Sequence, residues 1–118
     1  MDRELLAQYG IDFDVGLGHC MGDAAFYRTL LSMFLDDDCF PRAQAAFADG
    51  NAKELFSCMH ELKGVSGNAA LTALYNAVIP LVEALRNQDA VGEEIAPLFA
   101  RAQAAYDRTV QGIRLAVA

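Results

Sequence analysis

The stretch from Phe56 to Asn68 reads Phe56-Ser57-Cys58-Met59-His60-Glu61-Leu62-Lys63-Gly64-Val65-Ser66-Gly67-Asn68, and the rest of the chain is organised around it. It has the pattern of a helix, yet it carries two glycines, each of which costs about 1 kcal/mol relative to alanine inside a helix. Gly64 and Gly67 follow His60 by four and seven positions, so they share its side of the helix. A helix that gives up stability to clear space around one imidazole indicates that a bulky group must reach the ring.

The opposite side of this helix is apolar and predicts that it faces a core. The residues on that side are Leu55, Met59, Leu62 and Val65, with Cys58, Ser66 and Ala69. Apolar residues that recur every three or four positions are typical of an amphipathic helix. We therefore expect a helix over residues 52–68 that leaves His60 exposed.

Helical patterns cover most of the remaining chain. They span residues 3–9, 24–37, 40–48, 71–87 and 91–115. Asp23 is a suitable N-cap for the second of these segments. Residues 11–22 are rich in glycine and lack a clean period, so we read them as a loop with room for a helical turn around 14–20.

The segment 24–37 shows its apolar side most clearly. Phe26, Leu30, Met33 and Phe34 recur at spacings of three and four, so we expect them to face the core. We also expect the three methionines Met21, Met33 and Met59 to fill the core rather than form a binding surface. Pro80 lies inside the segment 71–87, where a kink is the expected result.

These segments predict an all-α protein. The chain has 118 residues, which fits a single domain over 1–118, and its hydrophobic fraction of 54% is ample for one core. Short connections make sequential helices antiparallel neighbours. We expect an antiparallel four-helix bundle with additional short helices near the N-terminus. The segments 24–37, 52–68, 71–87 and 91–115 are its four substantial helices.

Composition excludes several classes of function. The formal net charge of −7 disfavours binding to nucleic acid, which requires a basic surface. No apolar run approaches the roughly 20 residues that span a membrane, and no signal peptide is evident. Cys20, Cys39 and Cys58 are too far apart for a zinc pattern, and His19 and His60 lack ligand spacing, so we expect no metal.

The cellular setting follows from the same features. An odd number of separated cysteines is typical of reduced thiols in a cytoplasmic protein. We expect the chain to be cytoplasmic and monomeric. The initial Met1 and the short termini favour a free-standing protein.

The side of the helix that carries His60 suits phosphoryl chemistry. An exposed imidazole is substantially neutral at pH 7, and its free nitrogen is a nucleophile. Lys63, one turn further on, can place an ammonium beside an anion that arrives on the ring. Gly64 and Gly67 remove side chains that would obstruct this anion or a partner protein. No acidic residue pairs with His60 to form a Ser-His-Asp or Cys-His arrangement.

Two further residues on this side have two readings each. Lys53 is either an ordinary solvated lysine or a residue that attracts an acidic partner. Phe56 is either an exposed rim that suits partner docking or a ring buried under the neighbouring short helix. His19 has no comparable neighbours and is expected to be structural.

The segment His60-Glu61-Leu62-Lys63-Gly64-Val65-Ser66-Gly67-Asn68-Ala69-Ala70-Leu71 resembles the H-x-L-K-G-x-S-G-N-x-G motif of histidine-containing phosphotransfer (HPt) domains. These domains belong to bacterial multistep two-component phosphorelays. The resemblance extends over most of the chain, from the loop at residues 10–23 to the helix that contains residues 74–85. Ala70, Met59 and Pro80 depart from the usual pattern, and none of them touches the His-Lys-Gly core of the motif.

The resemblance implies a role for each matching residue. His60 is the residue expected to be phosphorylated. Lys63 is expected to steady the phosphoryl group, and Gly64 to leave room for it. Gly67 and Asn68 are expected to shape the helix end and, with Phe56 and Lys53, the docking surface.

The resemblance also implies the partners. Response-regulator receiver domains and a hybrid sensor histidine kinase would exchange phosphoryl groups with His60, and Mg²⁺ would be bound by the receiver rather than by this chain. The chain contains no nucleotide-binding loop, so we expect a phosphocarrier without ATP-dependent kinase activity and without a cofactor of its own. The alternative is a non-catalytic interaction module, a degenerate HPt fold that binds receivers without accepting phosphate. A metal or redox protein that uses the cysteines would need a ligand spacing that the chain lacks.

Overall fold

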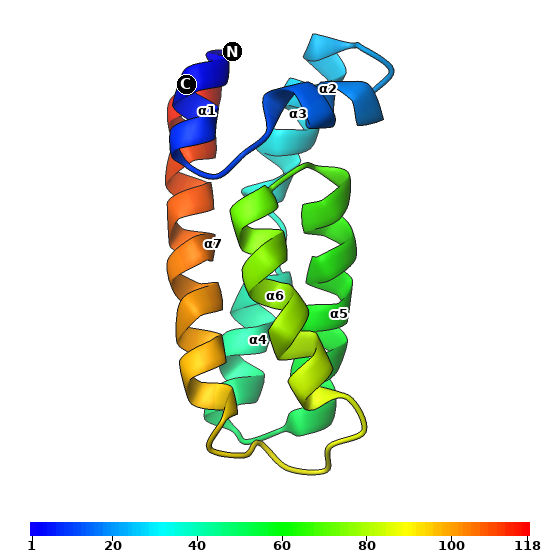
Figure 1. Ribbon diagram of the computed structural model, residues 1–118, viewed down its shortest axis with the longest axis vertical. Helices are drawn as coiled ribbons and strands as arrows, with labels where there is room; N and C mark the ends of the chain where they lie inside the picture. The colour runs from blue at the N-terminus through cyan, green and yellow to red at the C-terminus, as the bar shows by residue number, and fades with distance from the viewer.

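The computed structural model describes residues 1–118 and consists of seven helices without any strand (Figure 1). In chain order they are α1 (Arg3–Gln8), α2 (Phe13–His19), α3 (Ala24–Phe34), α4 (Cys39–Ala48), α5 (Ala52–Asn68), α6 (Thr72–Leu85) and α7 (Ile95–Val117). The predicted all-α class is confirmed, and α5 has the bounds expected from the sequence. No helix combines the length and the apolar composition needed to cross a membrane.

Helices α4, α5, α6 and α7 lie side by side along the long axis and form the bundle (Figure 1). Helix α1 lies beside the upper end of α7, and α2 lies across the same end of the molecule. The predicted antiparallel bundle with short helices near the N-terminus is thus confirmed. One assignment differs: the helix packed along α5 is α4, the segment expected to be a short addition, whereas α3 packs against the upper part of α7.

Aromatic side chains fill the space between α4 and α7. The ring of Phe40 stacks on Tyr106, with 4.3 Å between centroids, and on Phe99 at 5.5 Å. Phe47 stacks on the same Phe99 at 4.4 Å, with the two rings nearly parallel. Stacked pairs of this kind stabilise beyond the area that they bury. They connect the first helix of the bundle to the last.

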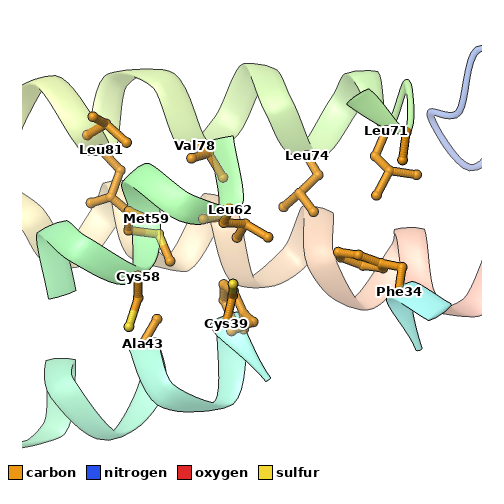
Figure 2. Packing of buried hydrophobic residues seen from close by; sticks show 14 of the residues in the cluster. Phe34, Cys39, Ala43, Cys58, Met59, Leu62, Leu71, Leu74, Val78 and Leu81 are labelled. Atoms are coloured by element: carbon orange, nitrogen blue, oxygen red, sulfur yellow. The ribbon is translucent and has the colours of Figure 1, made fainter. Parts of the chain in front are cut away.

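The apolar face of α5 packs against α4 on one side and against α6 on the other. Figure 2 shows Cys58 of α5 beside Ala43 of α4, and Met59 and Leu62 on the side of Leu81 and Val78 of α6. Met59 and Leu62 are fully buried, as expected for Met59. Burying a side chain of this size stabilises the fold by about 1.5–3 kcal/mol. The opposite face of α5 is therefore fixed in orientation.

Helix boundaries follow the capping side chains. The carboxylate of Asp23 accepts a hydrogen bond from the amide of Phe26 at 3.0 Å, as its predicted N-cap role requires. Helix α3 ends at Phe34, earlier than predicted, because Asp37 instead accepts from the amide of Cys39 at the start of α4. Helix α6 continues through the exposed Pro80.

The start of α7 was predicted too early. A turn precedes the helix, in which the amide of Ile95 donates to the carbonyl of Gly92 at 3.1 Å. The helix then begins at Ile95 rather than Val91. Pro97 falls in its first turn, where a missing backbone N–H costs nothing.

Residues 13–19 form the helix α2, so the helical turn expected around residues 14–20 is present and is longer than a single turn. Asp12 caps this helix by accepting from the amide of Val15 at 3.2 Å. Gly16 lies against the ring of Tyr27, where a Cβ atom would come within 2.1 Å of Cζ. The sequence lacks a clean period here because one position is reserved for a close contact with α3.

The buried side of α3 also differs from the prediction. Phe26 and Met33 are 58% and 63% exposed, and Met21 in the preceding turn is 94% exposed. Phe34 is buried as predicted, and the other buried residues are Tyr27 and Leu31, each one position after the predicted Phe26 and Leu30, so the buried stripe consists of Tyr27, Leu31 and Phe34. That stripe faces inward because the Tyr27 hydroxyl donates to the carbonyl of Ala69 at 2.7 Å, which satisfies both groups inside the protein.

Candidate functional site

His60 is exposed near the middle of α5, between the buried residues Met59 and Leu62. The side chain of Asn51 caps the helix by accepting from the amide of Glu54 at 3.1 Å. The imidazole is therefore carried by a capped helix whose other face is anchored in the core. This combination presents one ring to a partner at a fixed position.

A shallow depression beside His60 lies between α5 and α6. Its volume is about 360 Å³, and its lining consists of His60, Lys63, Gly64, Gly67, Asn68 and Tyr75. Sequence reasoning singled out five of these residues, all from one helix. Tyr75 was missed because it comes from α6, and no local pattern marks it as a neighbour of Gly67.

The two glycines of the depression have different surroundings. A Cβ atom built on Gly64 meets nothing within 4 Å. A Cβ atom on Gly67 would lie 3.3 Å from Cε2 of Tyr75, so this glycine lets the tyrosine approach closely. Packing within the chain therefore accounts for Gly67. It does not account for Gly64, which leaves open space next to His60.

Phe56 lies at the lower edge of the site. Its ring centroid is 5.8 Å from that of His60, and the ring is half-buried, between the two alternatives that the sequence left open. The guanidinium carbon of Arg86 lies 5.6 Å from the Phe56 centroid, a cation–π distance. A second depression adjoins this edge and is lined by Lys53, Phe56, Leu85, Arg86, Asn87, Gln88 and Asp89.

Arg86 was not identified from the sequence. It follows the buried Leu85 at the end of α6, and only the antiparallel packing of α5 and α6 brings it to Phe56. Arg86 donates to Glu83 at 3.0 Å. The hydrogen bond from Arg86, and to a smaller extent the charge of Lys63, hold the pKa of Glu83 below its usual value. Arg86 thus pairs with Glu83 within the range of the charge of Lys63.

The other flank of α5 faces α4 and is organised by Arg42. Its guanidinium lies 3.0 Å from Glu61, 3.1 Å from Asp38 and 4.0 Å from Glu54. The hydrogen bond from Arg42 holds the pKa of the Glu61 carboxyl below its usual value. Glu61 follows His60 directly in sequence, yet its carboxylate is bound on the side of α5 away from α6.

Two buried thiols lie under this flank and do not take part in the site. Burial, followed by a hydrogen bond to Glu54, raises the pKa of the Cys58 thiol to about 11. Burial also raises the pKa of Cys39. All three cysteines are free, and no group of three or more His, Cys, Asp or Glu side chains could hold a metal ion. Cys39 and Cys58 remain protonated and are poor nucleophiles at neutral pH.

His19 lies at the end of α2 and contacts the end of α5. Its Nδ1 atom is 3.0 Å from the carbonyl oxygen of Asn68. This contact joins α2 to the C-terminus of the helix that carries His60. It supports the structural role expected for His19.

The family model of the Hpt domain matches residues 29–112 of the chain. The matched range runs from α3 into the last turns of α7 and includes both depressions and the Arg42 cluster. Neither the curated proteins nor the solved structures contain a match to the chain. Hpt domains act in phosphorelay signalling, where they interact with receiver domains and kinases.

Proposed function

Because the chain belongs to the Hpt domain family, we propose that it is a phosphorelay intermediate in which His60 carries the phosphoryl group. His60 accepts this group from an aspartate of one receiver domain and passes it to an aspartate of another. The donor is the receiver of a hybrid sensor histidine kinase, and the acceptor is a response regulator. The chain acts as a cytoplasmic monomer.

One observation carries this proposal. His60 is exposed on an anchored helix. Gly64 lies one turn further along the same face, and the space that a side chain would fill at Gly64 is open. Lys63 lines the same depression and supplies a positive charge. The site can therefore accommodate a bulky anion and a docked protein, and packing within the chain gives no other reason for Gly64.

The transfer requires only the imidazole as a nucleophile. The lone pair of a ring nitrogen attacks phosphorus, and the N–P bond forms as the bond from phosphorus to the aspartate oxygen breaks. The carboxylate leaves with the electron pair, and the other ring nitrogen keeps its proton. Lys63 helps to neutralise charge on the transferred group. We expect Mg²⁺ to be bound by the receiver, and none by this chain.

The test is incubation of the purified protein with receiver domains phosphorylated on aspartate. We expect label on the chain that is labile in acid and stable in base, as for phosphohistidine. His60→Gln should abolish the label. His19→Gln is the matched control and should retain it, because His19 lies outside the depression.

The same experiment tests the alternative function. If receivers bind to the chain but none of them labels His60, the chain is a non-catalytic interaction module. Label that persists in His60→Gln would place the phosphoryl group on another residue and overturn the assignment.

A further inference from the structure

The surface beside His60 differs in charge from the rest of the chain. Lys53, Lys63 and Arg86 line the two adjoining depressions, and we call these three residues the basic edge. They include both lysines of the chain and three of its nine basic residues, in a protein with a net charge of −7. Only two of its sixteen acidic residues, Glu83 and Asp89, accompany them.

The carboxylates of α5 do not neutralise the basic edge. Glu54 and Glu61 are seven positions apart and share one side of the helix. Arg42 of α4 engages both, at 4.0 Å and 3.0 Å. The acidic residues of α5 are therefore bound on the α4 flank, and the α6 flank remains basic.

Arg86 is the most firmly placed member of the basic edge. Its guanidinium lies over Phe56, whose ring contacts His60, and Glu83 binds it from the same helix turn. Its side chain is still 45% exposed. A guanidinium has five N–H donors in a planar fork, and the contact with Glu83 leaves several of them free. Such a fork matches a carboxylate better than a lysine ammonium does.

We propose that Arg86 is a specificity-determining residue whose guanidinium, held over Phe56, binds a carboxylate on the surface of the receiver domain that docks at His60. The inference rests on the proposed function, because it concerns the partner that meets this site. Lys53 and Lys63 extend the same positive surface on either side of His60. A partner with an acidic rim around its own site is favoured over one with a neutral or basic rim.

Arg86 acts on association and not on the chemistry. The Phe56 ring contacts both groups, with its centroid 5.6 Å from the guanidinium carbon of Arg86 and 5.8 Å from the centroid of the imidazole. Its charge therefore meets the partner beside the phosphoryl group. Substitution should change the rate at which receivers associate and leave the reactivity of the imidazole intact.

The test compares Arg86→Glu with Arg101→Glu. Both variants change the net charge equally. Arg101 serves as the control because it is exposed on α7, which does not pack against α5. With receiver domains phosphorylated by acetyl phosphate, Arg86→Glu should lower the second-order rate of transfer to His60 by about tenfold or more at low salt. The difference in transfer rate between Arg86→Glu and the unmodified protein should become smaller at 0.5 M salt, because salt screens the charges. Arg101→Glu should stay within about twofold of the unmodified protein, since exposed distant charges couple weakly.

Two further measurements separate the failure of this inference from that of the proposed function. Phosphoramidate labels histidine without a partner, and Arg86→Glu should lose far less of this labelling than of the transfer from a receiver domain. If no receiver labels His60, the proposed transfer fails, and calorimetric binding of the unphosphorylated receivers then tests Arg86. Weaker binding in Arg86→Glu than in Arg101→Glu would support the inference. Equal effects of the two variants on transfer or on binding, or no binding to any receiver, would overturn it.

Discussion

The His60 depression and the contact between α1 and α7 both contain a glycine inside a long helix, for opposite reasons. At Gly112 of α7 a Cβ atom would lie 2.4 Å from Cβ of Tyr9, so the glycine permits α1 to approach. Arg108 completes this contact by donating to the carbonyl of Gln8 and by covering the Tyr9 ring at 5.7 Å. At Gly64 nothing lies within 4 Å.

The two glycines cost the same in helix propensity, about 1 kcal/mol each. At Gly112 this cost is offset within the folded chain, because the glycine allows α1 to pack against α7. At Gly64 it is not, so the benefit of that glycine must come from outside the chain. Substitutions at the two sites should therefore separate stability from function.

The largest effect is expected for Gly64→Leu. A leucine side chain would fill the space above His60 and displace a docked receiver, and misplacement by about 1 Å can lower a rate on the order of 10²-fold. Stability should rise by somewhat less than 1 kcal/mol, since leucine is the better helix former. The measurements are the rate of transfer from a phosphorylated receiver and the melting temperature.

The control for Gly64→Leu is Ala104→Leu, which also introduces a leucine but at an exposed position of α7. It should leave transfer unchanged. Normal transfer in Gly64→Leu would break the comparison, because Gly64 would then serve neither packing nor docking.

Gly112→Ala should have the second largest effect, and it should fall on stability. The added Cβ overlaps that of Tyr9, and overpacking of this kind costs about 1–3 kcal/mol. The midpoint of denaturant unfolding should move to lower concentration. Labelling of His60 by phosphoramidate should stay normal under conditions where the variant is folded.

Gly64→Ala is the control for Gly112→Ala because it makes the same change in helix propensity without a contact. It should stabilise the protein. If both variants stabilise, α1 adjusts freely on α7, and the close contact at Gly112 does not limit stability.

The smallest effect is expected for Gly67→Ala, which lies between the two cases. The added Cβ would be 3.3 Å from the Tyr75 ring, so the tyrosine must shift slightly and the gain in helix propensity is partly lost. We expect a net change in unfolding free energy below about 1 kcal/mol. A double-mutant cycle with Tyr75→Ala sharpens the test, because Gly67→Ala should be clearly stabilising once the ring is absent. No coupling between the two positions would show that Gly67 is as open as Gly64.

Much of the fold could be predicted from local pattern. The period of apolar residues placed α5 with its observed bounds, and Asp23 marked the start of α3 through its cap. These signals succeed because they depend on residues within one or two turns. The same reasoning predicted Phe34 of α3 correctly but placed Phe26 and Met33 in the core, because these residues are as apolar as the buried Leu31. The hydrogen bond from Tyr27 to Ala69 separates the two stripes, and it joins residues that are 42 positions apart.

The candidate site divides in the same way. His60, Lys63, Gly64 and Gly67 follow one another on a single helix, so the sequence alone grouped them, and the structure places all four in one depression. Tyr75 of α6 and Arg86, which directly follows α6, carried no signal, because a tyrosine and an arginine at such positions are unremarkable until a neighbour is known. The roles of Phe56 and Lys53 in docking stay predictions.

The sequence by itself determined the helical class, the helix that carries His60 and the polar side on which the ring lies, because periodicity and capping act over a few residues. Only the tertiary structure decided which stripe of α3 is buried and why Gly67 and Gly112 are glycines. It also decided that Arg42 binds the carboxylates on one flank of α5 and that Arg86 adds a positive charge on the other. Each of these depends on the separation of side chains from different helices. The antiparallel packing of the helices sets those separations, and no single helix encodes them.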